Sequence, residues 1–170
     1  MTLSMYDASA PVFLQMLKAL DSVIDKAVSF AAAKKLDPSV IPGLRLAADM
    51  LPFARQVQIS SDWAVRGVSR LAGVEPQSIP DEEKTLEQLK ERIAKAIAIV
   101  EAVKPEQLAG SESREVTFGI GGGKTMTAPG SQYLFHVTMP NFYFHVTAAY
   151  AILRHNGVEV GKRDFLGPVL

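Results

Sequence analysis

Apolar residues recur at spacings of three and four along much of this chain, which is typical of helices that bury one face. The first such helix is expected to begin near Ser9, a suitable N-cap residue, with Pro11 in the first turn, where proline is tolerated. It is expected to fade around Lys34 and Lys35, where positive charge complements the helix dipole. Its apolar stripe consists of Phe13, Met16, Leu17, Leu20, Val23, Ile24, Ala27 and Phe30. A stripe this wide predicts that the helix packs against a hydrophobic core.

The same spacing predicts two further helices. The second is expected to begin around Asp49, with Pro52 in its first turn, and Gly73 stands where a C-terminal cap belongs. The third is expected to run from about Asp81 to Val103, where a following proline ends it. Both have one apolar face, so both are expected to join the same core.

Residues 114–128 change character and predict a β-hairpin. Two short alternating segments, Glu115–Phe118 and Lys124–Thr127, flank a run of glycines at Gly119–Gly123. The end of this run resembles a phosphate-binding loop, but the first glycine of that motif would fall at Phe118, and a strand follows instead of a helix. The run is therefore interpreted as a turn, and nucleotide binding is not expected.

A fourth helix is expected in two parts, with Ser131 to Met139 leading to Pro140, which either kinks the helix or begins a new one. Asn156 and Gly157 form its stop, and the pattern leaves open whether the tail Val158–Leu170 is ordered. Four amphipathic helices with modest loops predict a single all-α domain spanning 1–170: a four-helix bundle with a small β-hairpin between its third and fourth helices.

Composition narrows the possible functions. The chain has 170 residues, 48% of them hydrophobic, and equal numbers of basic and acidic residues, 18 each, so nucleic-acid binding has no electrostatic support. The absence of cysteine excludes disulfides, thiolate metal ligands and a cysteine nucleophile. The first residues lack the features of a secretory signal, and no apolar run reaches the roughly 18 residues of a membrane span. A cytoplasmic protein without a membrane partner is expected.

The chain has three histidines, and one of them, His145, is a candidate site residue. His155 beside the helix stop is expected to cap the helix or lie at the surface, and His136 is expected to be structural. His145 stands four residues after Asn141, so both can point the same way from one helix. A partner for His145 is expected on the second helix, among Gln56, Gln58, Ser61 and Asp62. This polar group could be a satisfied core network, part of a small-molecule pocket, or a divalent metal site.

Aromatic residues are dense around this pair. They are expected mainly to pack in the core, although such a cluster could also wall a pocket or a dimer interface. The members are Tyr133, Phe135, Phe142, Tyr143, Phe144 and Tyr150.

Three segments carry a resemblance to a known family: Leu3–Ala8, Asn141–Val158 and Gly161–Gly167. Together they resemble an uncharacterised domain-of-unknown-function branch of the DinB/YfiT-like four-helix-bundle superfamily. The resemblance covers nearly the whole chain. It implies an up-down-down-up bundle, often homodimeric, with a divalent metal held by three histidines in many members. One of those histidines lies on the second helix and two lie four residues apart on the last; some members transfer small thiols.

This chain departs from that metal site. By the resemblance, His145 takes the place of the second histidine of the pair, Asn141 replaces the first, and Gln56 lies near the position on the second helix. Neutral amides are weak ligands for zinc or nickel. The resemblance therefore implies a degenerate site with no cofactor; nickel or zinc held by His145, Asn141 and Gln56 is the weaker alternative.

Three functions remain open from the sequence. The first is a homodimeric DinB-like protein with a non-catalytic role or a small-molecule pocket formed by Gln56, Asn141, Tyr143 and His145. This hypothesis predicts that His145 faces a glutamine of the second helix. The second is a transferase acting on a small thiol or similar nucleophile, with His145 as metal ligand or general base and Asn141 and Asp62 assisting. The third is a structural protein that self-associates. The sequence names no substrate, and it leaves the roles of the hairpin and the tail open.

Overall fold

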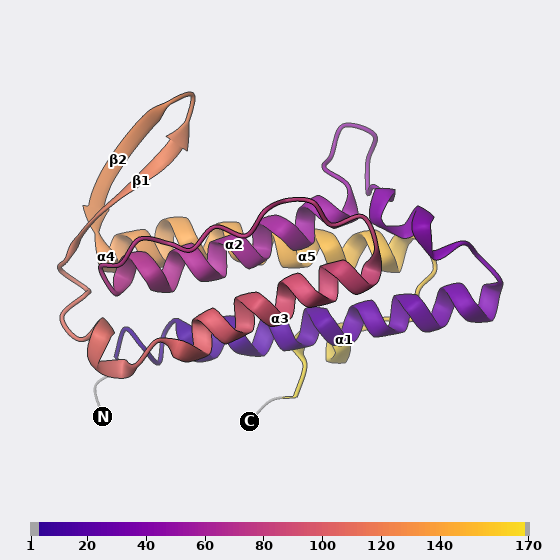
Figure 1. Ribbon diagram of the computed structural model, residues 1–170, viewed down its shortest axis with the longest axis horizontal. Helices are drawn as coiled ribbons and strands as arrows, with labels where there is room; N and C mark the ends of the chain where they lie inside the picture. The colour runs from indigo at the N-terminus through magenta and orange to yellow at the C-terminus, as the bar shows by residue number, and fades with distance from the viewer. Residues whose placement is uncertain (1–3, 169–170) are drawn as a thin grey trace.

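The computed structural model describes residues 4–168 and is mostly helical. The long helices α1 (Ala10–Lys34), α2 (Phe53–Leu71), α3 (Leu86–Ala102) and α5 (Met139–His155) lie side by side (Figure 1). Leu3 and the last two residues of the tail, which belong to segments discussed above, lie outside the described residues. The expectation of a mostly helical chain with a small hairpin is confirmed.

Shorter elements lie between the long helices and after the last of them. They are two 3₁₀ turns, η1 (Pro38–Gly43) and η2 (Pro105–Leu108), the single turn α4 (Gly130–Gln132), the π-helical segment η3 (Tyr133–Thr138) and the short helix α6 (Lys162–Leu166). Between residues 4 and 168, no helix combines the length and the apolar character that crossing a bilayer requires.

The core forms where the apolar stripes of the long helices meet. Phe13 of α1 and Phe142 of α5 are both fully buried and pack edge to face, with 4.9 Å between ring centroids. Gly67 of α2 lies beside Phe13, because a Cβ added there would stand 3.3 Å from the Phe13 ring and 2.6 Å from the side chain of Thr138. The missing side chain therefore lets α2 approach the start of α5 closely.

The ends of the first helix agree with the sequence, whereas the start of the second does not. α1 begins at Ala10 after Ser9 and ends at Lys34, as expected. α2 begins at Phe53 instead of near Asp49, and Pro52 is its N-cap residue in extended conformation. Proline disfavours the helical conformation of the residue before it, which prevents the helix from starting earlier.

The predicted start of the third helix was also wrong. α3 begins at Leu86 instead of near Asp81, because Thr85 and Gln88 form a capping box. The Thr85 hydroxyl accepts a hydrogen bond from the Gln88 amide at 3.3 Å, and the Gln88 side chain accepts one from the Thr85 amide at 3.2 Å. The acidic residues before this cap belong to the connector between α2 and α3, residues 72–85.

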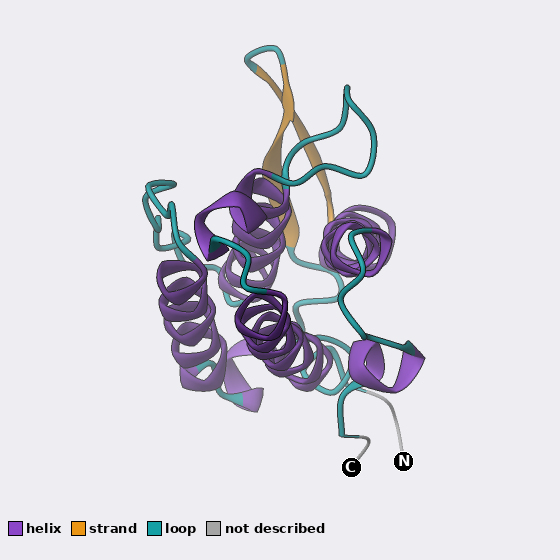
Figure 2. Ribbon diagram, turned by 90° about the vertical axis from the view of Figure 1, so that its right-hand side faces the viewer, coloured by secondary structure: helices purple, strands orange, loops and turns teal. Residues whose placement is uncertain are grey.

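The expected hairpin is present. Strands β1 (Glu115–Gly121) and β2 (Lys124–Pro129) pair antiparallel, and the hairpin stands away from the helices in the view along the longest axis of the molecule (Figure 2). Gly122 and Gly123 at the turn have φ of 58° and 73°, a region that side chains disfavour. The glycine run thus makes a turn between strands.

The last helix passes through a π-helical segment before it becomes regular. η3 leads directly into α5, and Pro140 lies in the first turn of α5. Of the two expected alternatives, a kink or a new helix, the proline therefore marks the start of a helix. The described part of the tail is ordered: Val158 and Val160 are buried, and Gln15 donates a hydrogen bond to the Leu166 carbonyl at 2.9 Å. The tail therefore packs on α1.

Candidate functional site

The interface between α2 and α5 joins His145 to Gln56. Nδ1 of His145 lies 2.7 Å from Oε1 of Gln56, and the Gln56 amide nitrogen donates to the backbone carbonyl of Leu51 at 3.1 Å. Gln56 is 1% exposed, whereas His145 is half-buried. His145 thus faces a glutamine of the second helix, as the sequence predicted, and the residue as a whole stays partly exposed.

The surroundings of His145 keep its ring neutral. Burial, and secondarily the positive charge of Arg55, lower the pKa of His145 below its ordinary value. The ring of Phe144 stands edge to face with the imidazole at 5.2 Å between centroids. A histidine with a lowered pKa is uncharged at neutral pH, so it offers a hydrogen-bond acceptor instead of a positive charge.

The other two predicted site residues make different contacts. The Asn141 side chain donates to the carbonyl of Val137 one turn earlier in its own helix, at 2.7 Å. Tyr143 is half-buried, its ring packs against Phe142 at 5.6 Å, and burial raises the pKa of its hydroxyl. The four-residue spacing of Asn141 and His145 therefore does not make them one hydrogen-bonded pair.

These residues do not fit a three-ligand metal centre. The carbonyl oxygen of Gln56 is engaged by the His145 ring, and the Asn141 amide is bonded to its own helix. Across the part of the chain that the structure describes, no group of three or more histidine, cysteine, aspartate or glutamate side chains could hold a metal ion. One imidazole with two amides is a poor donor set for zinc or nickel.

The other two histidines lie away from this pair. His136, on η3, is exposed, and so is His155, the last residue of α5. His155 therefore stands at the helix C-terminus as expected.

The aromatic cluster divides between core and surface. Tyr133 and Phe142 are buried, and Arg70 donates to the Tyr133 hydroxyl at 3.0 Å. Phe135 and Phe144 are exposed instead. Tyr143 and Tyr150 are partly buried and pack against the core, so the expectation of core packing fails only for Phe135 and Phe144, and exposed aromatic surface remains next to His145.

A buried ionic network beside the site was not anticipated. Arg92 of α3 has no exposed surface, and its guanidinium forms salt bridges with Asp62 at 2.5 Å, Asp81 at 3.0 Å and Glu83 at 3.0 Å. It also donates to the carbonyl of Pro80 at 2.9 Å. The network therefore fastens the α2–α3 connector to both helices.

The sequence held a signal for this arginine. Arg92 stands three residues after Leu89 and four before Ala96, so it occupies the inward stripe of its helix. A charged side chain in such a position requires buried partners of opposite charge.

The network reaches the candidate site through Arg55. Its guanidinium bonds the Gln58 side chain and Asp81 of the connector, both at 2.6 Å. Gln58 in turn donates to Glu83 at 2.8 Å. The positive charge near His145 is thus held and largely neutralised by the connector.

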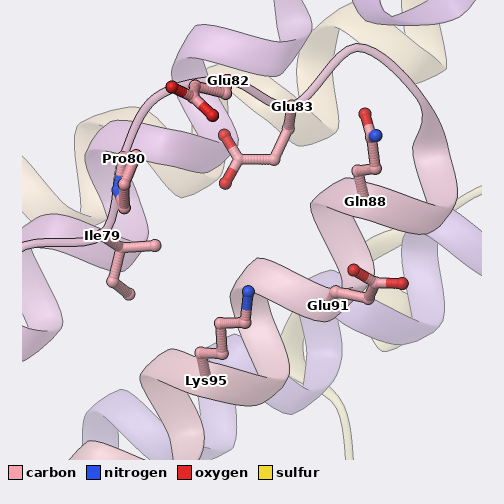
Figure 3. A pocket seen from close by; sticks show the side chains of 7 residues that line it. All are labelled: Ile79, Pro80, Glu82, Glu83, Gln88, Glu91 and Lys95. Atoms are coloured by element: carbon pink, nitrogen blue, oxygen red, sulfur yellow. The ribbon is translucent and has the colours of Figure 1, made fainter.

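A separate small hollow lies between the connector and α3. Figure 3 shows the connector's Glu82 and Glu83 on one side and Lys95 of α3 on the other. Its volume of about 210 Å³ is below the roughly 300–1,000 Å³ typical of ligand pockets. The full lining is Ile79, Pro80, Glu82, Glu83, Gln88, Glu91 and Lys95. It shares no residue with the His145–Gln56 pair, so it is a separate feature.

Comparisons with known proteins place this fold. The class is a helical DinB-like domain: the crystal structure of a DinB family member protein from Shewanella denitrificans matches with a TM-score of 0.88 and 42% sequence identity, covering 96% of this chain and 92% of that one. The family described as a domain of unknown function, DUF1993, matches residues 5–166. No curated protein matches the chain. The chain belongs to the DUF1993 family, as its resemblance to an uncharacterised DinB-like branch indicated.

Proposed function

We propose that this protein binds a small molecule at the surface between α2 and α5, with the imidazole of His145 as the principal polar contact, and that it does so without metal chemistry. The observation that carries the proposal is the 2.7 Å contact between His145 and buried Gln56. It holds the ring in one orientation. Among the described residues, the contact of Nδ1 with Gln56 is the hydrogen bond that the imidazole makes. The second ring nitrogen, Nε2, therefore stays available to a ligand.

The surface around the ring supports the proposal. Phe144, whose ring packs on the imidazole, is 58% exposed, and Leu51, whose carbonyl holds Gln56, is 44% exposed. Exposed apolar side chains beside one fixed polar group are the usual composition of a small-molecule site. The neutral ring adds an acceptor for a ligand N–H or O–H group.

The test is a titration of the ¹⁵N-labelled protein with a fragment library, followed by NMR. Fragments that bind are expected to shift the signals of His145 and of the Gln56 side-chain amide. The His145→Ala variant is expected to lose these shifts, and His155→Ala, which changes an exposed histidine of the same helix, is expected to retain them. Equal binding to His145→Ala, or shifts confined to the hollow beside Lys95, would contradict the proposal.

A second candidate is a transferase acting on a small thiol, favoured by the lowered pKa of His145. A neutral imidazole can accept a thiol proton as a general base. Activity toward small thiols that His145→Ala leaves unchanged would exclude this role. The metal-assisted form of this candidate requires that the untagged protein retain about one metal ion per chain after dialysis with nickel or zinc, and that His145→Ala lose this metal. One imidazole with two amides is a poor set of ligands, so this form is the weaker one.

The finer arrangement of the chain is part of the proposal. We place α1, α2, α3 and α5 in an up-down-down-up four-helix bundle; in its support, α1 and α5 run in one direction in Figure 1 and α2 and α3 in the other. A homodimer is supported by the exposed aromatic ring of Phe135, outside the proposed ligand site, which a second copy would cover. Sedimentation that gives a monomer at all concentrations would contradict the dimer and the purely structural, self-associating alternative. The cytoplasmic location and the single domain over 1–170 stay predictions.

A further inference from the structure

We infer that Gln56 is a positioning residue that holds the proton of His145 on Nδ1, so that the site selects ligands that donate a hydrogen bond to Nε2. The ligand class is then a neutral molecule with an O–H or N–H group, such as an alcohol, phenol or amide, and not a carboxylate or phosphate. The inference on Gln56 rests on geometry alone; the ligand class rests on the proposed function.

The argument starts at the backbone carbonyl of Leu51. A carbonyl oxygen accepts hydrogen bonds and cannot donate them. The side-chain atom of Gln56 that lies 3.1 Å from it is therefore the amide nitrogen. The two ends of the amide point in opposite directions, so its oxygen is the atom that faces His145 at 2.7 Å.

That oxygen determines where the imidazole proton resides. An amide oxygen carries no hydrogen, so the ring nitrogen 2.7 Å away has to be the donor. In a neutral imidazole one nitrogen carries the proton and the other a lone pair. With the proton on Nδ1 of His145, the lone pair lies on Nε2.

The burial of Gln56 makes this choice stable. The side chain is 1% exposed, so water does not compete for its two ends. The opposite amide orientation would set two acceptor oxygens, those of Gln56 and Leu51, against each other. Leaving a buried acceptor without a partner disfavours that state by roughly one to two orders of magnitude.

The nearby charges support a neutral donor as ligand. Arg55 is the cation that acts on His145, and its guanidinium is bound to Asp81 and Gln58 at 2.6 Å each. It therefore offers little attraction to an anion. An anionic oxygen would also meet the lone pair of Nε2, which is itself an acceptor.

The first experiment measures the tautomer by long-range ¹H–¹⁵N correlation of the imidazole rings in the full chain at pH 7.5. His145 is expected to be protonated at Nδ1, with Nε2 as an unprotonated acceptor; exposed His136 and His155 provide internal references in the same spectrum. Gln56→Ala is expected to move His145 toward the reference pattern. Gln56→Glu keeps an acceptor facing His145, and its second oxygen, when protonated, can donate to the Leu51 carbonyl, so this variant is expected to retain the Nδ1 proton.

Two outcomes of this measurement would overturn the role of Gln56. One is a wild-type His145 protonated at Nε2, and the other is an unchanged tautomer in a folded Gln56→Ala protein. Should Gln56→Ala fail to fold, the wild-type spectrum and the Gln56→Glu variant still decide the question. None of these readings depends on a ligand.

The second experiment compares phenol with anisole, which has the same ring but no O–H donor. Phenol is expected to shift the Nε2 signal of His145, and anisole to leave it in place. Equal shifts would overturn the ligand class while the proposed binding site stands. No shift with phenol, anisole or any library fragment would overturn both the ligand class and the proposed function, whatever the tautomer.

Discussion

Arg92 on α3 and Asp62 on α2 form a salt bridge with 2.5 Å between Nη2 and Oδ1, in a position where the arginine has no exposed surface. Glu83 of the connector bonds the same guanidinium from another side at 3.0 Å. Removing two charges from water is costly, and only close partners of opposite sign compensate for it. The contact therefore couples the position of the connector to the packing of α2 against α3.

Replacing Arg92 by leucine is expected to lower the free energy of unfolding by about 3–5 kcal/mol, because the carboxylate of Glu83 would stay largely buried without its cation and that of Asp62 would keep only Arg66, at 2.8 Å. Urea denaturation at pH 7 measures the change. The control is Lys18→Ala, which breaks a surface salt bridge with Glu101 of similar length, 3.0 Å, and is expected to cost less than about 1 kcal/mol. Equal costs for the two variants would show that the buried network contributes no more than a surface pair.

His145 predicts a pH dependence of stability. Its folded pKa is lowered, chiefly by burial, from an unfolded value near 6.5. Between the two values the unfolded chain binds more protons than the folded one, so the free energy of unfolding increases as the pH rises through this window. The contribution is complete above about pH 6.5 and is lost as the pH falls through the folded pKa.

Chemical denaturation of the wild type and of His145→Gln at several pH values between 5 and 8 checks this dependence. The difference in unfolding free energy between them is expected to shift in favour of the wild type as the pH rises. A difference that shifts the opposite way would mean that protonated His145 is stabilised in the fold.

Gly67 predicts a cost for a single methyl group. An added Cβ would stand 2.6 Å from Cγ2 of Thr138 and 3.3 Å from the ring of Phe13. Overpacking by the added methyl group is expected to cost about 1–3 kcal/mol. The better helix propensity of alanine offsets roughly 1 kcal/mol of this cost, so Gly67→Ala is expected to be destabilising overall. Calorimetry of Gly67→Ala and of Gly43→Ala, where an added Cβ meets open space, makes the comparison. A gain in stability at Gly67 would mean that the helices separate without cost.

The hairpin is expected to be anchored through one side chain of a cross-strand pair. Phe118 and Met126 are register partners, yet Phe118 is 3% exposed and packs on Tyr133 at 5.0 Å, whereas Met126 is 50% exposed. Phe118→Ala is expected to cost about 3–5 kcal/mol and Met126→Ala less than about 0.5 kcal/mol. Thermal unfolding of both variants measures this. Similar small effects would show that the hairpin contributes little to the core.

Local signals in the sequence were sufficient for some boundaries and misleading for others. Ser9 and Lys34 mark the ends of α1 correctly, although the Ser9 hydroxyl donates to the carbonyl of Met5 and makes no capping bond to the helix. Asp81 was expected to begin the third helix, but it lies in the connector, where its carboxylate bonds Arg92 and Arg55. The capping box of Thr85 and Gln88 was present in the sequence and gives the true start of α3.

What the sequence determined by itself is the helical periodicity, the glycine turn of the hairpin and membership of a DinB-like family of unknown function. Tertiary structure decided which polar groups meet. The sequence left four candidate partners for His145 on α2. Tertiary packing selected Gln56, 89 positions away, while Asn141, on the same helix as His145, bonds its own backbone. Periodicity follows from the geometry of a single helix, which the residues along it report directly. The pairing depends on how α2 and α5 are rotated and placed against each other, and packing of the whole core sets that arrangement.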